Sequence, residues 1–202
     1  MLLTSKDIKN PGLNILPPGV ERHIVNGGGL TAFQIFPDDE LEIINDEGNQ
    51  ICEIICFNKD GKSDLGILNL KDNNKKNFIR EILNKKDETI LATNYQLKKR
   101  NLNIKESKSS IIFDTDTKAE EKIKFKSKDK CYAIFAAPGE DMDVTKQNPP
   151  TDLTIFVKRA KIVNDKELNV IPDPVFEPVY EENIDKESCI SYEVKEGDYI
   201  QV

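Results

Sequence analysis

The chain has 202 residues, 38% hydrophobic and 32% charged, which suits one ordinary globular domain with or without a short additional segment. Its formal net charge of −7 argues against nucleic acid as the main partner, because phosphate binding needs a concentrated basic surface. The sequence shows no signal peptide, no apolar run near the ~20 residues of a membrane span and no CxxC pair among its four cysteines, so we expect a cytoplasmic protein with reduced thiols and no membrane partner.

Residues 1–22 are expected to form an extended arm, because prolines and glycines interrupt any periodic pattern there. Closely spaced strand candidates, separated by turns rich in Asp, Asn and Gly, then follow at 30–36, 41–44 and 50–57. Alternation in the third strand places Cys52, Ile54 and Cys56 on one face. That arrangement suits the packing of small hydrophobic groups in a core.

One short helix is predicted at about 72–84, where Asp72 or Asn73 can cap its start and apolar residues recur on one helical face. Further strands are expected at 89–93, 110–114, 123–125, 131–136 and 153–158. A parallel α/β fold would need helices between most of these strands. The sequence therefore predicts a mainly β protein, an antiparallel β-sandwich or barrel with one short helix.

Five lysines occupy every second position from Lys122 to Lys130, so in a strand they would share one face. We interpret them as the solvated face of an exposed hairpin, or of an edge strand protected against aggregation. A binding site for a polyanion is the alternative.

Residues 33–43 resemble residues 192–202 by residue class, and both stretches look like two strands joined by a tight turn. A proline-rich stretch that has the composition of an interdomain connection precedes the second copy. We therefore expect a β domain at 23–171, a linker at 172–182 and the truncated start of a second, similar domain at 183–202, with further C-terminal domains of the same chain missing. Chance similarity of two amphipathic hairpins is the alternative.

The residues that could carry catalysis or hold a metal are few. His23 is the one histidine, beside the expected arm, and a catalytic triad needs an imidazole placed by tertiary structure. Zinc sites use three or four Cys, His or carboxylate ligands, which Cys52 and Cys56 alone do not supply. Gly27, Gly28 and Gly29 lack the Lys-Ser/Thr that follows in a phosphate loop. We predict neither catalytic residues nor a bound metal.

Polar residues cluster around one turn, the strand that follows it and a later loop. The candidate ligand-binding residues are Asp46, Asn49, Gln50, Glu53, Thr151 and Asp152. Gln50 and Glu53 could point into a barrel mouth, where amide and carboxylate groups orient a small polar ligand. The alternative is that the cluster only satisfies turn backbone hydrogen bonds. Negative local charge favours a cationic or amidine-like metabolite such as guanidine, a methylated amine or a urea derivative.

An apolar strand, Asp46-x-Gly48-Asn49-Gln50, and a second apolar strand ending in Phe57-Asn58 form a pattern that resembles the urea carboxylase-associated (urea amidolyase-associated) domain family. The Pro-Pro-Thr-Asp-Leu stretch at 149–153 resembles the family as well. The resemblance covers mainly residues 23–58 and 131–159. Stand-alone members are linked to guanidine and urea metabolism and carry a His-Asp and Cys constellation that looks metal-binding. This chain has no histidine after His23 and no matching Cys pair, so that activity does not carry over.

Domains of this family also occur ahead of aminomethyltransferase-like (glycine-cleavage T-type) domains. The resemblance therefore implies a non-catalytic small-molecule-binding or structural module of a larger folate-linked enzyme. It implies no cofactor in this part and tetrahydrofolate in the parent protein. Two alternatives stay open, a metal-free hydrolase or deaminase of guanidine–urea metabolism and a protein interaction module.

Overall fold

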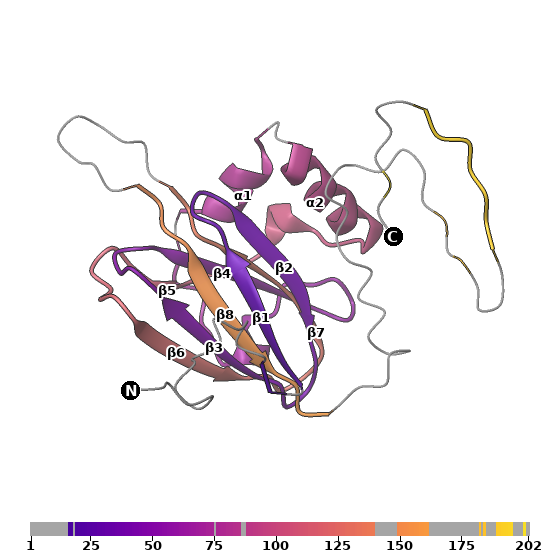
Figure 1. Cartoon of the computed structure of the whole chain (residues 1–202). Helices are drawn as coiled ribbons and strands as arrows, with labels where there is room; N and C mark the ends of the chain where they lie inside the picture. Colours follow the sequence, from indigo (N-terminus) through magenta and orange to yellow (C-terminus); the bar gives the residue numbers. More distant parts are fainter. Residues whose placement is uncertain are drawn as a thin grey trace, which may run out of the picture.

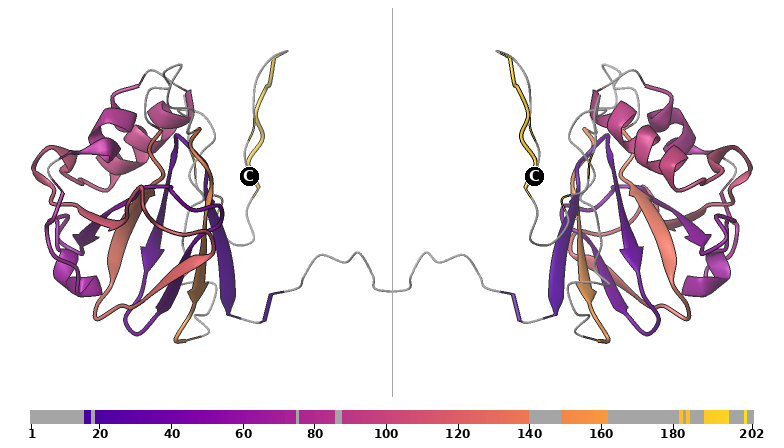
Figure 2. Two further views of the ribbon diagram at one scale, coloured as in Figure 1. Left: turned by 90° about the vertical axis from the view of Figure 1, so that its left-hand side faces the viewer. Right: turned by 90° about the vertical axis from the view of Figure 1, so that its right-hand side faces the viewer.

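Two antiparallel sheets packed as a sandwich form the body of the molecule. The computed structural model describes residues 16–17, 19–74, 76–85, 88–139, 149–161, 182, 184, 189–195 and 200. Within them, eight strands form two four-stranded sheets, and two helices cover one side (Figures 1 and 2). The predicted fold class is confirmed, as a sandwich with two helices where one was expected.

The strands largely alternate between the two sheets along the chain. Sheet A has the spatial order β1 (Val20–Val25), β8 (Leu153–Lys158), β3 (Glu40–Asn45) and β6 (Glu121–Lys126). Sheet B has the order β2 (Leu30–Ile35), β7 (Cys131–Ala136), β4 (Cys52–Asn58) and β5 (Ser110–Phe113). Because most connections cross between the sheets, turns and loops gather at the two ends of the sandwich.

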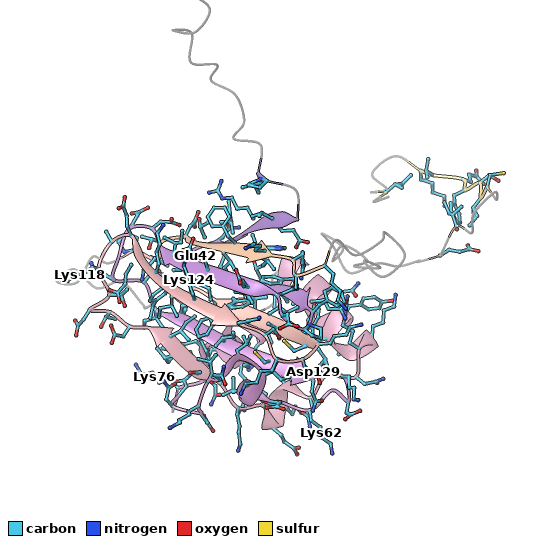
Figure 3. All side chains as sticks on the ribbon, turned by 90° about the horizontal axis from the view of Figure 1, so that it is seen from below. Glu42, Lys62, Lys76, Lys118, Lys124 and Asp129 are labelled. Atoms are coloured by element: carbon cyan, nitrogen blue, oxygen red, sulfur yellow. The ribbon has the colours of Figure 1, made fainter. Side chains whose placement is uncertain are left out.

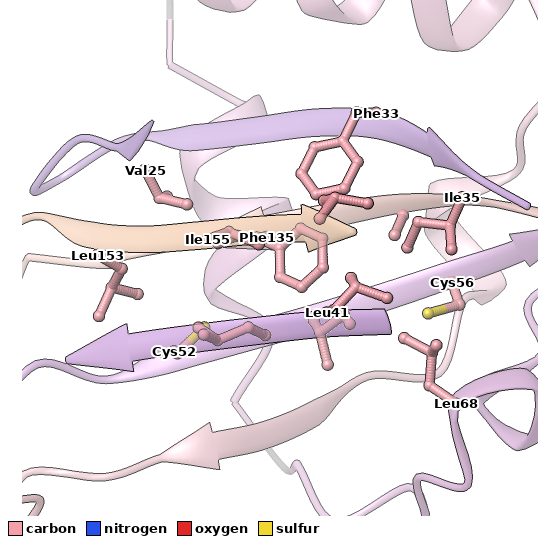
Figure 4. Packing of buried hydrophobic residues seen from close by; sticks show 14 of the residues in the cluster. Val25, Phe33, Ile35, Leu41, Cys52, Cys56, Leu68, Phe135, Leu153 and Ile155 are labelled. Atoms are coloured by element: carbon pink, nitrogen blue, oxygen red, sulfur yellow. The ribbon is translucent and has the colours of Figure 1, made fainter. Parts of the chain in front are cut away.

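The main hydrophobic core lies between the sheets, where inward-facing side chains of both meet (Figure 4). Leu41 and Ile155 contribute from sheet A, and Phe135 from sheet B. The predicted alternation in β4 is confirmed, because Cys52, Ile54 and Cys56 all belong to this core. Burial raises the pKa of the Cys52 thiol. A hydrogen bond with Cys131, together with burial, raises the pKa of the Cys56 thiol. Both thiols therefore behave as small neutral core groups.

A second core joins the helices to the outer face of sheet B. Helices α1 (Phe78–Leu83) and α2 (Glu88–Lys99) pack there, together with Ile55 and Phe57 of β4 and Ile134 of β7. The 3₁₀ turns η1 (Leu65–Leu68) and η2 (Ile104–Glu106) complete the regular structure of the described residues. All six residues of β7 are buried, since it is covered on both faces. Its unbroken apolar sequence follows from this position.

Two expectations about the helical region are wrong. Residues 89–93, expected as a strand, lie in α2, where Ile90 and Leu97 pack on sheet B, so tertiary packing overrides local β propensity. Neither Asp72 nor Asn73 caps α1, which follows Asn77. Asn73 instead exchanges two hydrogen bonds with the backbone of Ile111.

The beginning of the sandwich was not anticipated, and its far end is only partly described. Strand β1 starts at Val20, within the expected arm at 1–22, and it was not predicted. Most of the predicted linker at 172–182 and of the predicted second domain at 183–202 lies outside the described residues, so both stay predictions.

The edge-strand interpretation is confirmed for three of the five lysines of the stripe, since Lys128 and Lys130 lie beyond the strand. Strand β6 lies at the edge of sheet A, with Lys122, Lys124 and Lys126 exposed and the residues between them packed toward the core. Lys124 pairs with Glu42 at 3.2 Å on the outer surface (Figure 3). Such charges discourage another strand from adding to an open edge.

Candidate functional site

One end of the sandwich collects most of the predicted site residues. It is formed where β3 and β7 finish and β4 and β8 start, and we call it the Gln50 end. The opposite end, where β8 finishes and β1 and β3 start, is called the Arg159 end. The antiparallel registers fix this division, since Asn45 pairs with Leu153 at one end and Glu40 with Lys158 at the other.

The side chain of Gln50 ties three segments together. It is 4% exposed, and its Nε2 donates to the carbonyl oxygens of Ile51 at 2.9 Å and Pro138 at 3.0 Å. Its Oε1 accepts from the backbone N–H of Thr151 at 2.8 Å. Pro138 lies 88 positions and Thr151 101 positions along the chain from Gln50. A neutral amide therefore holds the loops after β7 and before β8 against the start of β4.

Asn45 lies directly behind Gln50. It is the last residue of β3, is completely buried, and its Nδ2 donates to the carbonyl oxygen of Gln50 at 2.8 Å. Among the residues that the structure describes, the buried side-chain atoms without a hydrogen-bond partner are Asn45 Oδ1 and Thr151 Oγ1. Both atoms belong to residues that form a hydrogen bond with Gln50.

A small hollow opens at this end. Its cavity volume is about 20 Å³, and its lining consists of Asn49, Gln50, Ile51, Thr115, Pro138, Pro149 and Pro150. None of these residues is charged, but the acidic Asp46 and Asp152 lie on segments beside it. A cavity of this size has room for roughly one water molecule, so it is much smaller than a usual ligand pocket.

The other predicted site residues have roles in the fold. Asp46 accepts from the Thr154 hydroxyl at 2.9 Å, and Asp152 accepts from the N–H of Gly27 at 2.8 Å. Gly27 has no room for a side chain, since a Cβ there would lie 2.4 Å from the carbonyl oxygen of Pro150. Asn49 adopts a left-handed conformation with φ 57°, which Asn tolerates better than most residues.

The side chain of Glu53 does not line the hollow at the Gln50 end. Its carboxylate lies on the helix side of β4, where it accepts from Ile79 N–H at 2.7 Å and from Asn74 Nδ2 at 2.6 Å. Burial raises the pKa of Glu53, although hydrogen bonds from Ser109, Ile79 and Asn74 oppose that effect. Glu53 therefore anchors the first turn of α1, whose N-terminal N–H groups need acceptors.

The weaker candidates are also placed by the structure. His23 lies in β1, where its ring stacks on Phe33 with centroids 4.1 Å apart and its Nε2 lies 3.2 Å from Glu21. Nowhere in the described ranges do three His, Cys, Asp or Glu residues gather in a way that could hold a metal ion. In the same part of the chain, neither helix is long and apolar enough to cross a membrane.

The Arg159 end holds a charged network that sequence reasoning missed. The Arg159 side chain is 5% exposed, and its guanidinium bonds both carboxylate oxygens of Glu21 at 2.7 and 2.6 Å and Asp39 Oδ2 at 2.6 Å. Burial alone would raise the pKa of Glu21, but hydrogen bonds from His23 and Arg159 lower it to about 2. Glu21 and Asp39 precede Arg159 by 138 and 120 positions, so no local pattern could have indicated the network.

Asn45 was missed for a different reason, because the sequence does contain a signal for it. Leu41 and Ile43 face the core, and continued alternation points Asn45 inward as well. An inward-facing amide at a strand end indicates either a buried hydrogen-bond network or a site. The strand predicted at 41–44 stops one residue before Asn45, so this signal was not used.

No protein-family model matches the chain. Over 195 residues, 96% of the chain, it is 31% identical to trimethylamine-oxide aldolase from Ruegeria pomeroyi (strain ATCC 700808 / DSM 15171 / DSS-3). The chain spans 25% of the length of that protein, in its N-terminal region. We conclude that the chain is a β-sandwich domain homologous to the N-terminal region of trimethylamine-oxide aldolase.

The structure was also compared with solved structures. A DUF1989 family protein from Silicibacter pomeroyi DSS-3 matches with a TM-score of 0.37 and 12% identity, over 80% of this chain and 85% of that one. DUF1989 is the urea carboxylase-associated family that the sequence pattern resembles. This structural likeness is too remote to add to the fold described above.

Proposed function

We propose that the chain is a small-molecule-binding module, without catalytic residues of its own, of a larger folate-linked, aminomethyltransferase-like enzyme. The observation that supports this most is the 31% identity over 96% of the chain to one quarter of trimethylamine-oxide aldolase. In such a parent, tetrahydrofolate would bind outside this domain. The module would supply a rigid sandwich with one small polar site at the Gln50 end.

The site's size and chemistry support a ligand that is small and polar. The hollow of about 20 Å³ is lined mainly by amide, hydroxyl and proline groups, with Asp46 and Asp152 on neighbouring segments. Carboxylates near a partly enclosed site favour a cation. A methylated amine fits these requirements, and the relative is named for trimethylamine oxide.

Ligand-induced thermal stabilisation tests the proposal. The chain is melted with trimethylamine oxide, dimethylammonium, guanidinium and urea at low millimolar concentration, and we expect at least one of them to raise Tm, because a ligand that binds only the folded state stabilises it. Thr115→Arg introduces a large cationic side chain into the lining and should remove that increase. Leu91→Arg adds the same charge at an exposed position of α2 that does not line the hollow, and should leave it unchanged.

The same samples test for catalysis. We expect no ammonia from guanidine or urea, and no loss of trimethylamine oxide, on prolonged incubation with the chain. Ammonia release would favour the hydrolase or deaminase alternative. If no ligand raised Tm, or if Thr115→Arg responded as the wild-type chain does, ligand binding at the Gln50 end would be ruled out.

A further inference from the structure

The turn between β2 and β3 makes two specific demands on its sequence. Because β2 belongs to sheet B and β3 to sheet A, the turn forms an arch that crosses between the sheets. Asp38 has a φ of 68°, in the left-handed region that favours glycine. Asp39 is 1% exposed, and its carboxylate accepts from Phe36 N–H at 2.9 Å and from the Arg159 guanidinium at 2.6 Å. The arch therefore needs a residue that tolerates a left-handed φ, followed directly by a buried carboxylate.

Residues 192–202 meet both demands at the same spacing. When they are aligned with residues 33–43, Gly197 falls on Asp38 and Asp198 falls on Asp39. Glycine adopts a left-handed φ without the strain that a side chain brings, so the second stretch suits this turn better than the first. The aspartate is the one aligned position at which the two stretches are identical.

The positions that face the core in the arch are apolar in both stretches. In the first stretch they are almost completely buried, and they are Phe33, Ile35, Leu41 and Ile43. The aligned residues of the second stretch are Tyr192, Val194, Ile200 and Val202. Tyr192, Val194 and Ile200 are 53%, 54% and 62% exposed, so the described part of the chain leaves this apolar face largely uncovered. Such side chains stabilise a protein only when they are buried.

The glycine and the aspartate carry more weight than the apolar positions. Alternating apolar residues occur in any pair of amphipathic strands. The other two residues are independent of that alternation, since one serves the backbone of the turn and the other serves the charge network beneath it. One contact is not repeated, because Lys195 stands where Phe36 lies 5.5 Å from the Arg159 guanidinium.

We propose that residues 192–202 encode a second copy of the β2–β3 arch, and that in a longer protein they open a second sandwich whose buried arginine or lysine pairs with Asp198. A buried carboxylate without a counter-ion would be strongly destabilising. Arg159 follows Asp39 by 120 positions, so the second cation is expected about as far beyond Asp198. The chain spans 25% of the length of its relative, which leaves room for a second sandwich in a protein of that length.

A graft tests whether the second stretch encodes the arch. Residues 33–43 of the full chain are replaced by the sequence of residues 192–202. We expect one cooperative melting transition, at most about 10 °C below that of the wild-type chain, because the core changes keep apolar side chains of similar size. A second graft keeps Phe36, since a lysine beside Arg159 would add repulsion between like charges.

A register-shifted graft is the matched control. It carries the sequence of residues 191–201 at positions 33–43, which turns every side chain to the opposite face. This control should show no cooperative transition. If the graft that keeps Phe36 also failed to melt cooperatively, or melted no higher than the control, the second arch would be overturned.

Arg159→Ala tests whether the grafted turn presents its carboxylate correctly. The substitution should lower Tm by about 10 °C in the wild-type chain, and by the same amount in the graft that keeps Phe36. A graft whose Tm did not respond to Arg159→Ala would show that its aspartate does not reach the arginine. The pairing inferred for Asp198 would then be overturned.

Two aspartate variants locate the partner of Asp198. Asp39→Ala should lower Tm of the 202-residue chain by about 10 °C, because the buried Arg159 loses a counter-ion. Asp198→Ala should leave that Tm unchanged and should lower Tm in the longer protein by about as much as Asp39→Ala does. A fall in the 202-residue chain would place the partner of Asp198 within these residues and overturn the second sandwich. An unchanged Tm in the longer protein would overturn the buried pair.

Discussion

The two ends of the sandwich are built on different chemistry. At the Arg159 end, one buried guanidinium meets two carboxylates, and its hydrogen bonds are made within the protein. At the Gln50 end, a neutral amide holds backbone groups of three segments, and the buried oxygens Asn45 Oδ1 and Thr151 Oγ1 have no partner among the described residues. Both networks connect strands far apart in sequence, so both fix the fold.

This difference indicates where the molecule has capacity to bind something else. A buried ion network is stable only when its charges are fully paired, and at the Arg159 end Asp39 also accepts from Phe36 N–H and Ala160 N–H. A neutral network tolerates an unfilled position at lower cost. We therefore expect the Arg159 end to contribute more to stability, while ligand binding at the Gln50 end stays a proposal, and the following predictions test that division.

The largest effect is expected at Arg159. Arg159→Ala leaves Glu21 and the almost completely buried Asp39 without their counter-ion, and breaking a buried pair in this way costs about 3–5 kcal/mol. Urea denaturation should show the loss as a lower midpoint. Arg159→Lys keeps the charge but not the two-pronged contact with Glu21, so its loss should be smaller. A loss below 1 kcal/mol in Arg159→Ala would contradict the assignment.

The second largest loss of stability is expected at Glu53, whose side chain supports α1 and does not line the hollow. Glu53→Ala removes the acceptor for Ile79 N–H and Asn74, and should lower the free energy of unfolding by about 2–3 kcal/mol. Hydrogen exchange at the first amides of α1 should become faster. Glu42→Ala, a surface change in sheet A beside Lys124, should cost less than about 1 kcal/mol.

A Gln50→Ala, Glu53→Ala double variant is consequently expected to melt well below the wild-type chain. The alternative, in which both residues point into a barrel mouth and only orient a ligand, would leave the unliganded stability nearly unchanged. If the double variant melted like the wild-type chain, the structural role assigned to Glu53 would be wrong.

The elements that were predicted well are those whose sequence and environment agree. The apolar runs 131–136 and 153–158 are bounded by polar turns, and they form β7 and β8 with the predicted limits. The alternating lysines of β6 likewise match an edge strand with one solvent-exposed face. The stretch at 89–93 failed because contacts with sheet B, which the local sequence does not contain, make it helical.

The candidate site was predicted only in part, because the local sequence indicates some of its residues and distant segments supply the others. Turn composition pointed to Asn49 and Gln50, and both line the hollow. Alternation already placed Glu53 on the opposite face of β4 from Cys52, and that face turned out to be covered by a helix. The contacts that make Gln50 the centre of the site come from Pro138 and Thr151, on distant segments. Only the sandwich topology brings those segments together.

The smallest predicted effect is a pH dependence that belongs to the Arg159 end. The pKa of Glu21 is lowered to about 2 in the folded chain, from an ordinary value of 4.5, so the folded state binds this proton less tightly than the unfolded state does. The stability that Glu21 contributes is therefore present above pH 4.5 and is lost as the pH falls from about 4.5 toward 2. Because a third of the side chain is exposed, solvent screening limits the effect to about 1–2 kcal/mol.

Glu53 must be separated from this measurement, because its raised pKa acts in the opposite direction. The folded chain binds the Glu53 proton more tightly, so that contribution decreases as the pH rises above 4.5. Glu53 is present in both the wild-type chain and Glu21→Gln. Its contribution therefore cancels when the unfolding free energy of the variant is subtracted from that of the wild-type chain at each pH. The difference should be about 1–2 kcal/mol at pH 6 and should shrink steadily below pH 4.5.

Glu40→Gln, whose carboxylate makes only an exposed 3.5 Å pair with Lys158, should differ from wild type by less than about 0.5 kcal/mol at every pH. A Glu21→Gln difference that did not change with pH would show that the Arg159 network stabilises the fold through packing and not through charge.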